Sequence, residues 1–275
     1  MMNLLDVVGW TFRRSPADTI RLYNTLSGVM VAATGGASLN FGLWTNDCSE
    51  PLLAQENMAR YFGMVADLDT AGVVADIGCG RGEPARIWCQ SYPNISVIGV
   101  DVNRMGLAEA GDMDFAINAL STSLPLSNGS VDRVLALESA QHFYPLSAFV
   151  SEAARVLKPG GMLCMAIPVA GRRYHAGRLG LLWLTWTSEH HHLSTIHGSI
   201  ESAGLHILHE EMVGSMVYIP MADYYTDNRN VLRERITSTY PNYVESILYH
   251  SIRDMRRASM KNVIEYVIVK CQAPT

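Results

Sequence analysis

The sequence predicts an α/β fold: a mostly parallel, doubly wound sheet with helices on both faces, N-terminal helices and a helical lid. From Gly72 onward, short runs rich in β-branched residues alternate with helical segments, which is typical of βαβ units. A glycine-rich turn follows the first run and leads into a helix. We expect seven strands, in the segments GVVADI, SVIGVD, DFAIN, VDRVLAL, GMLCMAI, LHILHEEMV and VIEYVIVK.

Helical patterns occupy the segments before and between these strands. Residues 1–30 are expected to be helical, with Pro16 near the start of a helix and a hinge over residues 31–36. Residues 50–68 carry apolar side chains at helical spacing, so we expect a helix that packs on the sheet. The stretch AFVSEAARVLKPGG predicts a helix closed by Lys158, Pro159 and Gly160 just before the next strand.

The length of 275 residues and the hydrophobic content of 48% predict a single domain, 1–275, with a sizeable core. We expect an N-terminal helical cap over residues 1–50, a cofactor-binding core over 51–170, and lid segments over 171–200 and 214–260. The lid segments are rich in Trp, His and Tyr. They follow strands at the carboxyl edge of the sheet, where ligands bind in open α/β folds.

Charge and cysteine content limit the partners. A net charge of −5 and a pI near 6.0 argue against nucleic acid, because phosphate backbones are held by clustered Lys and Arg. The five cysteines have neither the spacing of a zinc site nor the density of a disulfide scaffold, so we expect a reduced, cytoplasmic setting. We expect no secretory signal, and no membrane span, because the apolar stretch around Leu181 is shorter than the roughly 20 residues that a span needs.

The most informative motif is VVADIGCGRGEPARIW, in which Asp76 and the glycines Gly78, Gly80 and Gly82 join a strand to a helix. Glycines permit a tight turn and let a ligand approach the backbone. Asp101 ends the next strand, where a carboxylate can accept both ribose hydroxyls of a nucleoside. A glycine-rich turn alone also fits a purely structural role. The third glycine of a dinucleotide fingerprint is replaced by Glu83, which argues against a nicotinamide cofactor.

The segment DIGCGRG resembles the first motif of the class I S-adenosylmethionine-dependent methyltransferases, and further matching segments bring the resemblance to residues 20–270. These segments are LNFGLW, INALSTSLPLSNGSVDRVLALESAQHF and ARVLKPGGML. The LNFGLW and ALES-x-x-H segments are similar to the branch that methylates small molecules, such as tocopherols, sterols, prenyl diphosphates and macrolides. The resemblance implies a Rossmann-like, seven-stranded fold, S-adenosylmethionine as cofactor and a small organic acceptor, such as a terpenoid or aromatic natural product methylated on oxygen or carbon.

The resemblance also implies roles for individual residues. Gly78, Cys79 and Gly80 are expected at the methionine moiety, with Asp76 and Gly82 in the same motif. The remaining cofactor contacts that it implies are Asp101 at the ribose, Val102 and Asn103 at the adenine, Asn118, Ala119 and Leu120 in an adenine-capping loop, Tyr23, Asn40 and Trp44 over the methionine end, and Glu138 at the end of the fourth strand.

Methyl transfer from a sulfonium depends mainly on placing the acceptor beside the methyl group, so few residues need a chemical role. A hydroxyl acceptor benefits from a general base. His142, just beyond the fourth strand, is the first candidate base, and a packing role is equally compatible with its position. Glu138 and His190 complete the catalytic candidates. His190 belongs to the run Glu189–His192, which we interpret as a solvated lid segment rather than a metal site, and we predict no metal.

An apolar acceptor pocket is expected from the aromatic side chains of the lid, namely Trp183, Trp186, Tyr218, Tyr224 and Tyr225. Arg172, Arg173 and Arg178 could instead grip a diphosphate or carboxylate, although a solvated basic turn is the simpler interpretation. The apolar N-terminal helix could cap the cofactor or join two copies in a homo-oligomer. Two alternatives stay open: a cofactor-binding subunit without turnover, and a nucleotide-cofactor oxidoreductase.

Overall fold

The computed structural model describes residues 15–36, 39–45, 48–110, 113–185 and 191–275. The chain divides into two compact units, which we describe separately. The first unit comprises the described residues of Met1–Asn57, Ala170–Glu189 and Val213–Glu265, and the second those of Met58–Val169, His190–Met212 and Tyr266–Thr275. The assignment of residues 1–275 to one domain, with its cap, core and lid, stays a prediction.

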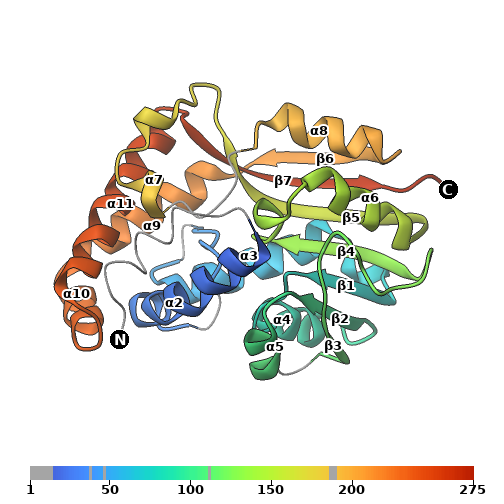
Figure 1. Cartoon of the computed structure of the whole chain (residues 1–275), viewed down its shortest axis with the longest axis horizontal. Helices are drawn as coiled ribbons and strands as arrows, with labels where there is room; N and C mark the ends of the chain where they lie inside the picture. The colour runs from blue at the N-terminus through green and yellow to red at the C-terminus, as the bar shows by residue number, and fades with distance from the viewer. Residues whose placement is uncertain (1–14, 37–38, 46–47, 111–112, 186–190) are drawn as a thin grey trace. The chain divides into compact units, whose positions relative to one another are not determined.

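The second unit is built on a seven-stranded sheet with the order β3-β2-β1-β4-β5-β7-β6 (Figure 1). The pairs β1–β2, β1–β4, β2–β3 and β4–β5 are parallel, and β6 pairs antiparallel with β7 at one edge. The expected mostly parallel α/β sheet is therefore confirmed. The strands are β1 (Val73–Ile77), β2 (Ser96–Asp101), β3 (Phe115–Asn118), β4 (Val131–Leu137), β5 (Leu157–Ala170), β6 (His206–Met212) and β7 (Ile264–Gln272).

Helices cover both faces of this sheet. Ala75 and Ile77 of β1 share a buried cluster with Phe149 of α6 and Ile196 of α8. Alternate residues of a strand face opposite sides, so the neighbouring positions face α3. Arg133 of β4 lies on this second face, because its guanidinium donates to the carbonyls of Ala66 and Asp67, which directly follow α3. The helical elements here are the end of α3 (Pro51–Val65), η1 (Leu68–Thr70), α4 (Glu83–Ser91), α5 (Arg104–Glu109), η2 (Ala140–His142), α6 (Leu146–Val156) and α8 (Leu193–Ser202).

The helix expected to close at Lys158–Gly160 ends earlier, at Val156. β5 already begins at Leu157, which pairs with Val131. The register then shifts, so that Met162 pairs with Arg133. The residues between Leu157 and Met162 form an irregularity within the strand rather than the cap of the helix.

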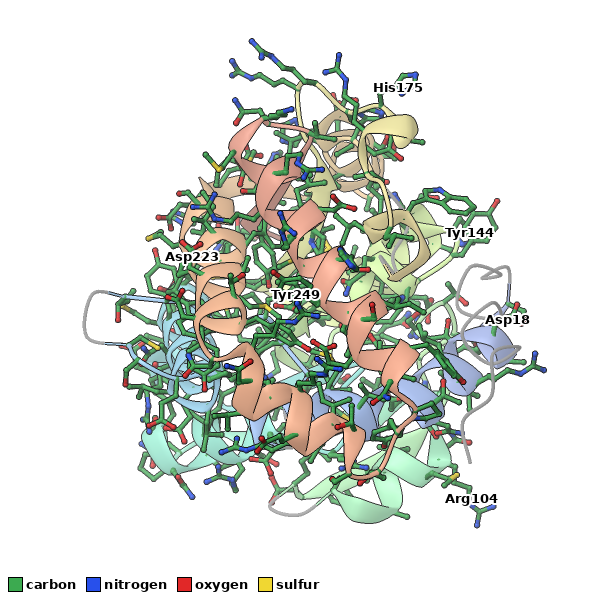
Figure 2. The ribbon with its side chains drawn as sticks, turned by 90° about the vertical axis from the view of Figure 1, so that its left-hand side faces the viewer. Asp18, Arg104, Tyr144, His175, Asp223 and Tyr249 are labelled. Atoms are coloured by element: carbon green, nitrogen blue, oxygen red, sulfur yellow. The ribbon has the colours of Figure 1, made fainter. Side chains whose placement is uncertain are left out.

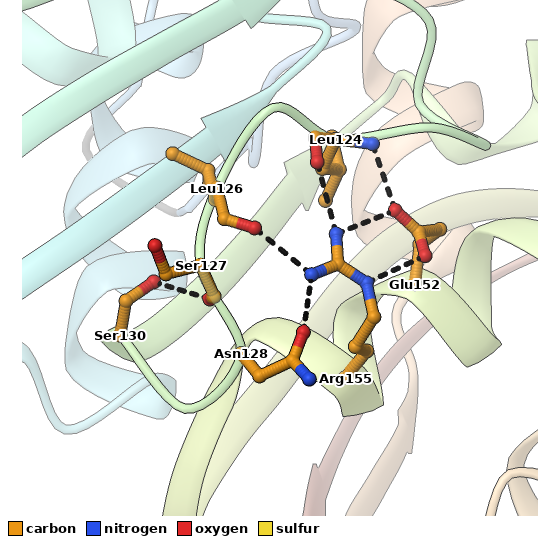
Figure 3. Close-up of polar contacts among 7 residues, drawn as sticks. All are labelled: Leu124, Leu126, Ser127, Asn128, Ser130, Glu152 and Arg155. Carbon is orange, nitrogen blue, oxygen red and sulfur yellow. Dashed lines mark hydrogen bonds and ion pairs between the residues drawn. The ribbon is translucent and has the colours of Figure 1, made fainter.

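Arg155, near the end of α6, holds the loop that leads into β4 (Figure 3). Its guanidinium donates to the carbonyl oxygens of Leu124 and Leu126 at 2.9 Å each and to Asn128 Oδ1 at 2.7 Å. Glu152 fixes the guanidinium and also accepts the N–H of Leu124 at 2.8 Å. The single guanidinium of Arg155 thus donates hydrogen bonds to three acceptor oxygens of this loop.

We expect Arg155→Lys to lower the free energy of unfolding by about 2 kcal/mol, because an ammonium cannot replace several fixed guanidinium hydrogen bonds. Thermal or urea unfolding would measure this. Arg86→Lys is the matched control, since Arg86 makes the same i,i+3 pair with Glu83 on the outer face of α4 but holds no loop. Equal losses in both variants would contradict a loop-anchoring role for Arg155.

The first unit is helical. α2 (Pro16–Thr34) begins with a capping box between Ser15 and Asp18 and ends at Gly35, which is left-handed with φ 79°. The hinge expected over residues 31–36 is therefore wrong for residues 31–34, because the helix continues to Thr34 before the glycine stops it. The other elements are the start of α3, η3 (Ala176–Arg178), α7 (Leu182–Thr185), α9 (Gly214–Asp227), α10 (Arg229–Thr237) and α11 (Asn242–Met260).

The helices α2, α9, α10 and α11 share one buried cluster, which includes Val29, Tyr225, Leu232 and Leu248. Figure 2 shows α9 and α11 side by side, with Asp223 on one and Tyr249 on the other, and these two helices pack closely. No helix within the described residues is long and apolar enough to cross a membrane.

Candidate functional site

The glycine-rich turn lies at the carboxyl end of β1, as expected. Gly78, Gly80 and Gly82 all have positive φ, at 77°, 56° and 77°. Gly78 also has to be small, because a Cβ there would lie 2.4 Å from the Cβ of Ser139. Around Gly80, by contrast, a Cβ would meet no atom within 4 Å. The turn is therefore packed closely at Gly78 and open at Gly80.

Asp101 ties this turn to the end of β2. Its Oδ2 accepts the N–H of Gly80 at 2.8 Å, and its Oδ1 accepts the N–H of Asn103 at 2.7 Å. Burial raises the pKa of Asp101, although these backbone N–H groups act to lower it. Each carboxylate oxygen has a second lone pair, so the group can accept further hydrogen bonds from a ligand.

Asp76 is a polar side chain whose burial in the fold is energetically costly. Its side chain on β1 is 3% exposed, and its Oδ2 has no hydrogen-bond partner among the described residues. Burial, and next to it the charge of Asp101, raises the pKa of Asp76 to about 7. A buried carboxylate without a partner is costly, and a cationic ligand group would relieve that cost. The same burial raises the pKa of the Cys79 thiol, which argues against a thiolate there.

The side chains expected around an adenine are held by the ends of β2 and β3. Asn118 Nδ2 donates to the carbonyls of Asp101 and Val102 at 2.9 Å each, and the N–H of Ala119 donates to the Asp101 carbonyl. Asn103 caps α5 through its Oδ1. Leu120, with 44% of its surface exposed, is free to contact a ligand through its apolar side chain. These residues form one wall beside Asp101.

Glu138 follows β4 in a left-handed conformation, with φ 51°. One of its carboxylate oxygens accepts the hydroxyl of Tyr266 on β7 at 2.9 Å. The next residue, Ser139, donates its hydroxyl to the carbonyl of Ile77 at 2.6 Å, which joins the ends of β4 and β1. Glu138 is thus held in a defined position at the same edge of the sheet as the glycine turn.

Of the two histidines predicted as candidate bases, only His142 lies within the described residues. His142 ends η2, three residues beyond Ser139, and is half-buried. His190 lies outside the described residues, and so does Trp186. Among the residues that the structure describes, no group of three or more His, Cys, Asp or Glu side chains could hold a metal ion. The catalytic roles of His142, Glu138 and His190 stay predictions.

Tyr23, Asn40 and Trp44 belong to the first unit, whereas the glycine turn and Asp101 belong to the second. Asn40 is buried, and its Oδ1 accepts the N–H of Gly42 at 2.9 Å. Trp44 packs against Tyr224 with ring centroids 5.5 Å apart. Tyr23 packs on α2 beside Leu22. Their contact with a cofactor stays a prediction.

A small, mainly apolar cavity lies within the first unit. Its volume is about 30 Å³, enough for a few ligand atoms. Tyr225 is 4% exposed, and its hydroxyl oxygen is buried without a hydrogen-bond partner among the described residues. Burial raises the pKa of this hydroxyl, which therefore stays protonated as a donor. The cavity is lined by residues of α2, the 40–55 segment, and α9 to α11, including Ala33, Asn40, Phe41, Trp44, Tyr224 and Tyr225.

The sequence did not single out several residues that shape these sites. Tyr266 and Ser139 act through contacts with residues far away along the chain, which no local pattern signals. Among the predicted pocket aromatics, Tyr224 and Tyr225 do line the cavity. Tyr218 is instead fully buried, packs on Phe41 and donates to the carbonyl of Glu265, while Trp183 is half exposed.

Comparison with known proteins gives the family of the central segment. Residues 75–165 match the model of the methyltransferase domain family. This range includes the glycine turn, Asp101, Asn118, Glu138 and His142.

The chain is also similar to curated proteins over part of its length. It is 29% identical to erythromycin 3''-O-methyltransferase of Saccharopolyspora erythraea over 60% of this chain and 58% of that protein. It is 30% identical to methyltransferase GfsG of Streptomyces halstedii over 62% of this chain and 66% of that protein. The chain therefore matches less than two thirds of the length of these relatives.

Among solved structures, the fold is similar to that of the [4+2]-cyclase SpnF. The TM-score is 0.76 at 21% identity, over 96% of this chain and 98% of that one. At this identity the likeness concerns the fold alone.

Proposed function

We propose, because residues 75–165 belong to the methyltransferase domain family, that this chain transfers the methyl group of S-adenosylmethionine to a small organic acceptor. The observation that carries the proposal is the pairing of an open glycine turn with two carboxylates, the buried Asp76 and the half-buried Asp101. The curated relatives support the reaction class, since both are named as methyltransferases.

The residues present fit this cofactor. The open space at Gly80 lets a ligand lie against the backbone. The remaining lone pairs of Asp101 suit the two hydroxyls of a ribose. The unpartnered Oδ2 of Asp76 suits a cationic group, which the ammonium of a bound amino acid moiety provides.

We infer that Asp76, Gly78, Cys79, Gly80 and Gly82 hold the methionine end and that Asp101 holds the ribose. Val102, Asn103, Asn118, Ala119 and Leu120 are proposed for the adenine, and Tyr23, Asn40 and Trp44 for the methionine end. When bound, the cofactor supplies an electrophilic methyl group. The main task of the chain is then to orient the acceptor and exclude water.

A hydroxyl acceptor must lose a proton as it is methylated. We propose His142 or Glu138 for this step, because both follow β4 at the edge of the sheet that carries the glycine turn. The hydrogen bond from Tyr266 occupies one acceptor oxygen of Glu138 and orients the carboxylate, so we favour His142 as the base. His190 remains a further candidate.

The cavity of the first unit is proposed to hold part of an apolar acceptor. Its lining is mainly aromatic and aliphatic, with a few polar side chains that include Asn40, and Tyr225 offers one buried donor. A ligand group that combines an apolar body with a carbonyl, ether or hydroxyl oxygen would complement this lining. A terpenoid, polyketide or aromatic metabolite has that chemistry.

Tyr225→Phe tests this cavity. We expect the KM for the acceptor to rise about tenfold, because a buried hydrogen bond is lost. The free energy of unfolding should stay equal or increase slightly, because the variant removes an unpartnered buried hydroxyl. Tyr224→Phe is the control, with little change expected in KM. An unchanged KM in Tyr225→Phe would exclude the proposed contact.

The proposed function itself is tested by calorimetric titration of adenosylhomocysteine, S-adenosylmethionine and NAD, followed by a screen of acceptors with a labelled methyl donor. Binding of both adenosyl ligands but not NAD, with label transfer to a small apolar acceptor, is the expected result. Adenosyl binding without transfer to any acceptor would favour the non-catalytic subunit. NAD binding alone would favour an oxidoreductase. We also propose that the chain forms a homo-oligomer, binds no nucleic acid and works in the cytoplasm.

A further inference from the structure

The first unit carries a strongly basic surface that the proposed function does not use. Residues 171–183 and 249–262 together contain seven arginines and lysines but only one carboxylate, although the whole chain has a net charge of −5. Six of these cationic residues are exposed, and we call them the basic surface: Arg172, Arg173, Arg178, Arg253, Arg257 and Lys261.

Backbone contacts hold the two segments together, so the cations form one surface. The N–H of Arg173 donates to the carbonyl of Asn262 at 2.9 Å, just beyond α11. Further along, the N–H of Leu181 donates to Asp254 Oδ2 at 2.9 Å. Residues 171–183 thus follow the C-terminal half of α11. Figure 2 shows His175 in this segment, among side chains that end in nitrogen.

The spacing on α11 places three of the cations in one line. Arg253 and Arg257 are four residues apart on the same face of α11, and Lys261, the residue that caps the helix, follows four residues later. Asp254 neutralises only Arg257, with which it pairs at 2.9 Å. Within the described part of the chain, no carboxylate pairs with Arg172, Arg173, Arg178 or Lys261. The surface therefore keeps most of its positive charge.

Bulky apolar side chains are exposed on the same two segments. Trp183 is 50% exposed and Leu181 38%, while Met260 on α11 is 60% exposed. Leu179 and Leu182 are buried and anchor the segment from beneath. An exposed tryptophan beside unpaired arginines is a combination that suits the interface of a membrane, where the ring lies at the level of the headgroups.

We propose that the basic surface binds the surface of an anionic phospholipid bilayer. The cations attract acidic headgroups, and Trp183, Leu181 and Met260 insert among them. An acidic protein would satisfy the cations but would leave these separate apolar side chains without a matching partner. Such binding goes beyond methyl transfer and does not rest on it. It would bring the enzyme to the place where apolar acceptors accumulate.

Vesicle sedimentation tests the proposal with the full-length protein. We expect binding to vesicles of phosphatidylcholine with about a third phosphatidylglycerol, little binding to phosphatidylcholine alone, and weaker binding at high salt. The double variant Arg172→Glu/Arg173→Glu should weaken binding more than tenfold, and Trp183→Ala several-fold. The control Arg233→Glu/Arg235→Glu makes the same change in net charge on exposed residues of α10.

Two results would overturn the proposal. Equal weakening in the two double variants would mean that only the net charge matters. An absence of vesicle binding, together with binding to polyglutamate, would point to an acidic protein partner instead. Circular dichroism of each variant confirms that it is folded, and retained adenosylhomocysteine binding separates this test from that of the proposed function.

Discussion

Replacement of Asp101 by alanine is expected to weaken the binding of adenosylhomocysteine about 100-fold. A charge-assisted hydrogen bond contributes about 1.5–3 kcal/mol, and every 1.4 kcal/mol changes affinity tenfold. Asp101 is proposed to accept bonds from the ribose, and its carboxylate also positions the N–H of Gly80. The variant therefore loses a direct contact and the anchor of the glycine turn. Calorimetric titration would measure both the affinity and the binding enthalpy.

Asp114→Ala is the matched control for this prediction. Asp114 also accepts a backbone N–H of β2, from Val97 at 2.9 Å, together with the hydroxyl of Ser96 at 2.7 Å. It does so at the opposite end of the strand from Asp101. We expect a loss of stability in this control but unchanged affinity. Equal loss of affinity in both variants would show that Asp101 acts only by stabilising β2.

The second large effect is the pH dependence of stability that Asp76 produces. Its pKa is about 7 in the folded chain, above the ordinary value for an aspartate. The folded state therefore holds this proton over a pH range in which the unfolded state has lost it, and stability falls as the pH rises from about 4 to 7. Above pH 7 the folded chain bears the full cost of burying the charged carboxylate, whose Oδ2 has no hydrogen-bond partner among the described residues.

Asp76→Asn removes this titration. We expect the stability of the variant relative to the original chain to increase by about 2–3 kcal/mol between pH 5 and pH 8. Urea unfolding at both pH values would measure it. The affinity for adenosylhomocysteine should fall in the variant at pH 8, because an amide cannot pair with an ammonium group.

Asp132→Asn is expected to lower stability at neutral pH, the opposite of the effect expected for Asp76→Asn. Burial acts to raise the pKa of Asp132, but hydrogen bonds from Lys158, Val73 and Gly72 outweigh it and lower the pKa. Asp132 therefore stabilises the fold above the ordinary aspartate pKa, and the variant should be less stable at neutral pH.

A difference in stability between Asp76→Asn and the original chain that does not change with pH would exclude a raised pKa at Asp76.

The predicted strands are found where the sequence places them, because period-two patterning and turn residues act within a few positions of each strand. The glycine turn and the carboxylate of Asp101 lie at strand ends for the same reason. Boundaries were less predictable. α2 continues to Thr34, inside the expected hinge, and α6 ends before the expected cap, since pairing of Leu157 with Val131 takes that residue into the sheet.

By itself the sequence determined the α/β class, the order of strands and helices, the turn after β1, and the excess of cations in residues 171–183 and 249–262. These follow from local periodicity, local turn chemistry and charge. Only the tertiary structure decided which distant groups meet: Tyr266 with Glu138, the segment around Arg173 with α11, and Tyr225 with a cavity. It also left Asp76 Oδ2 without a hydrogen-bond partner among the described residues. Such outcomes depend on packing between segments far apart in the chain, which no short window of sequence contains.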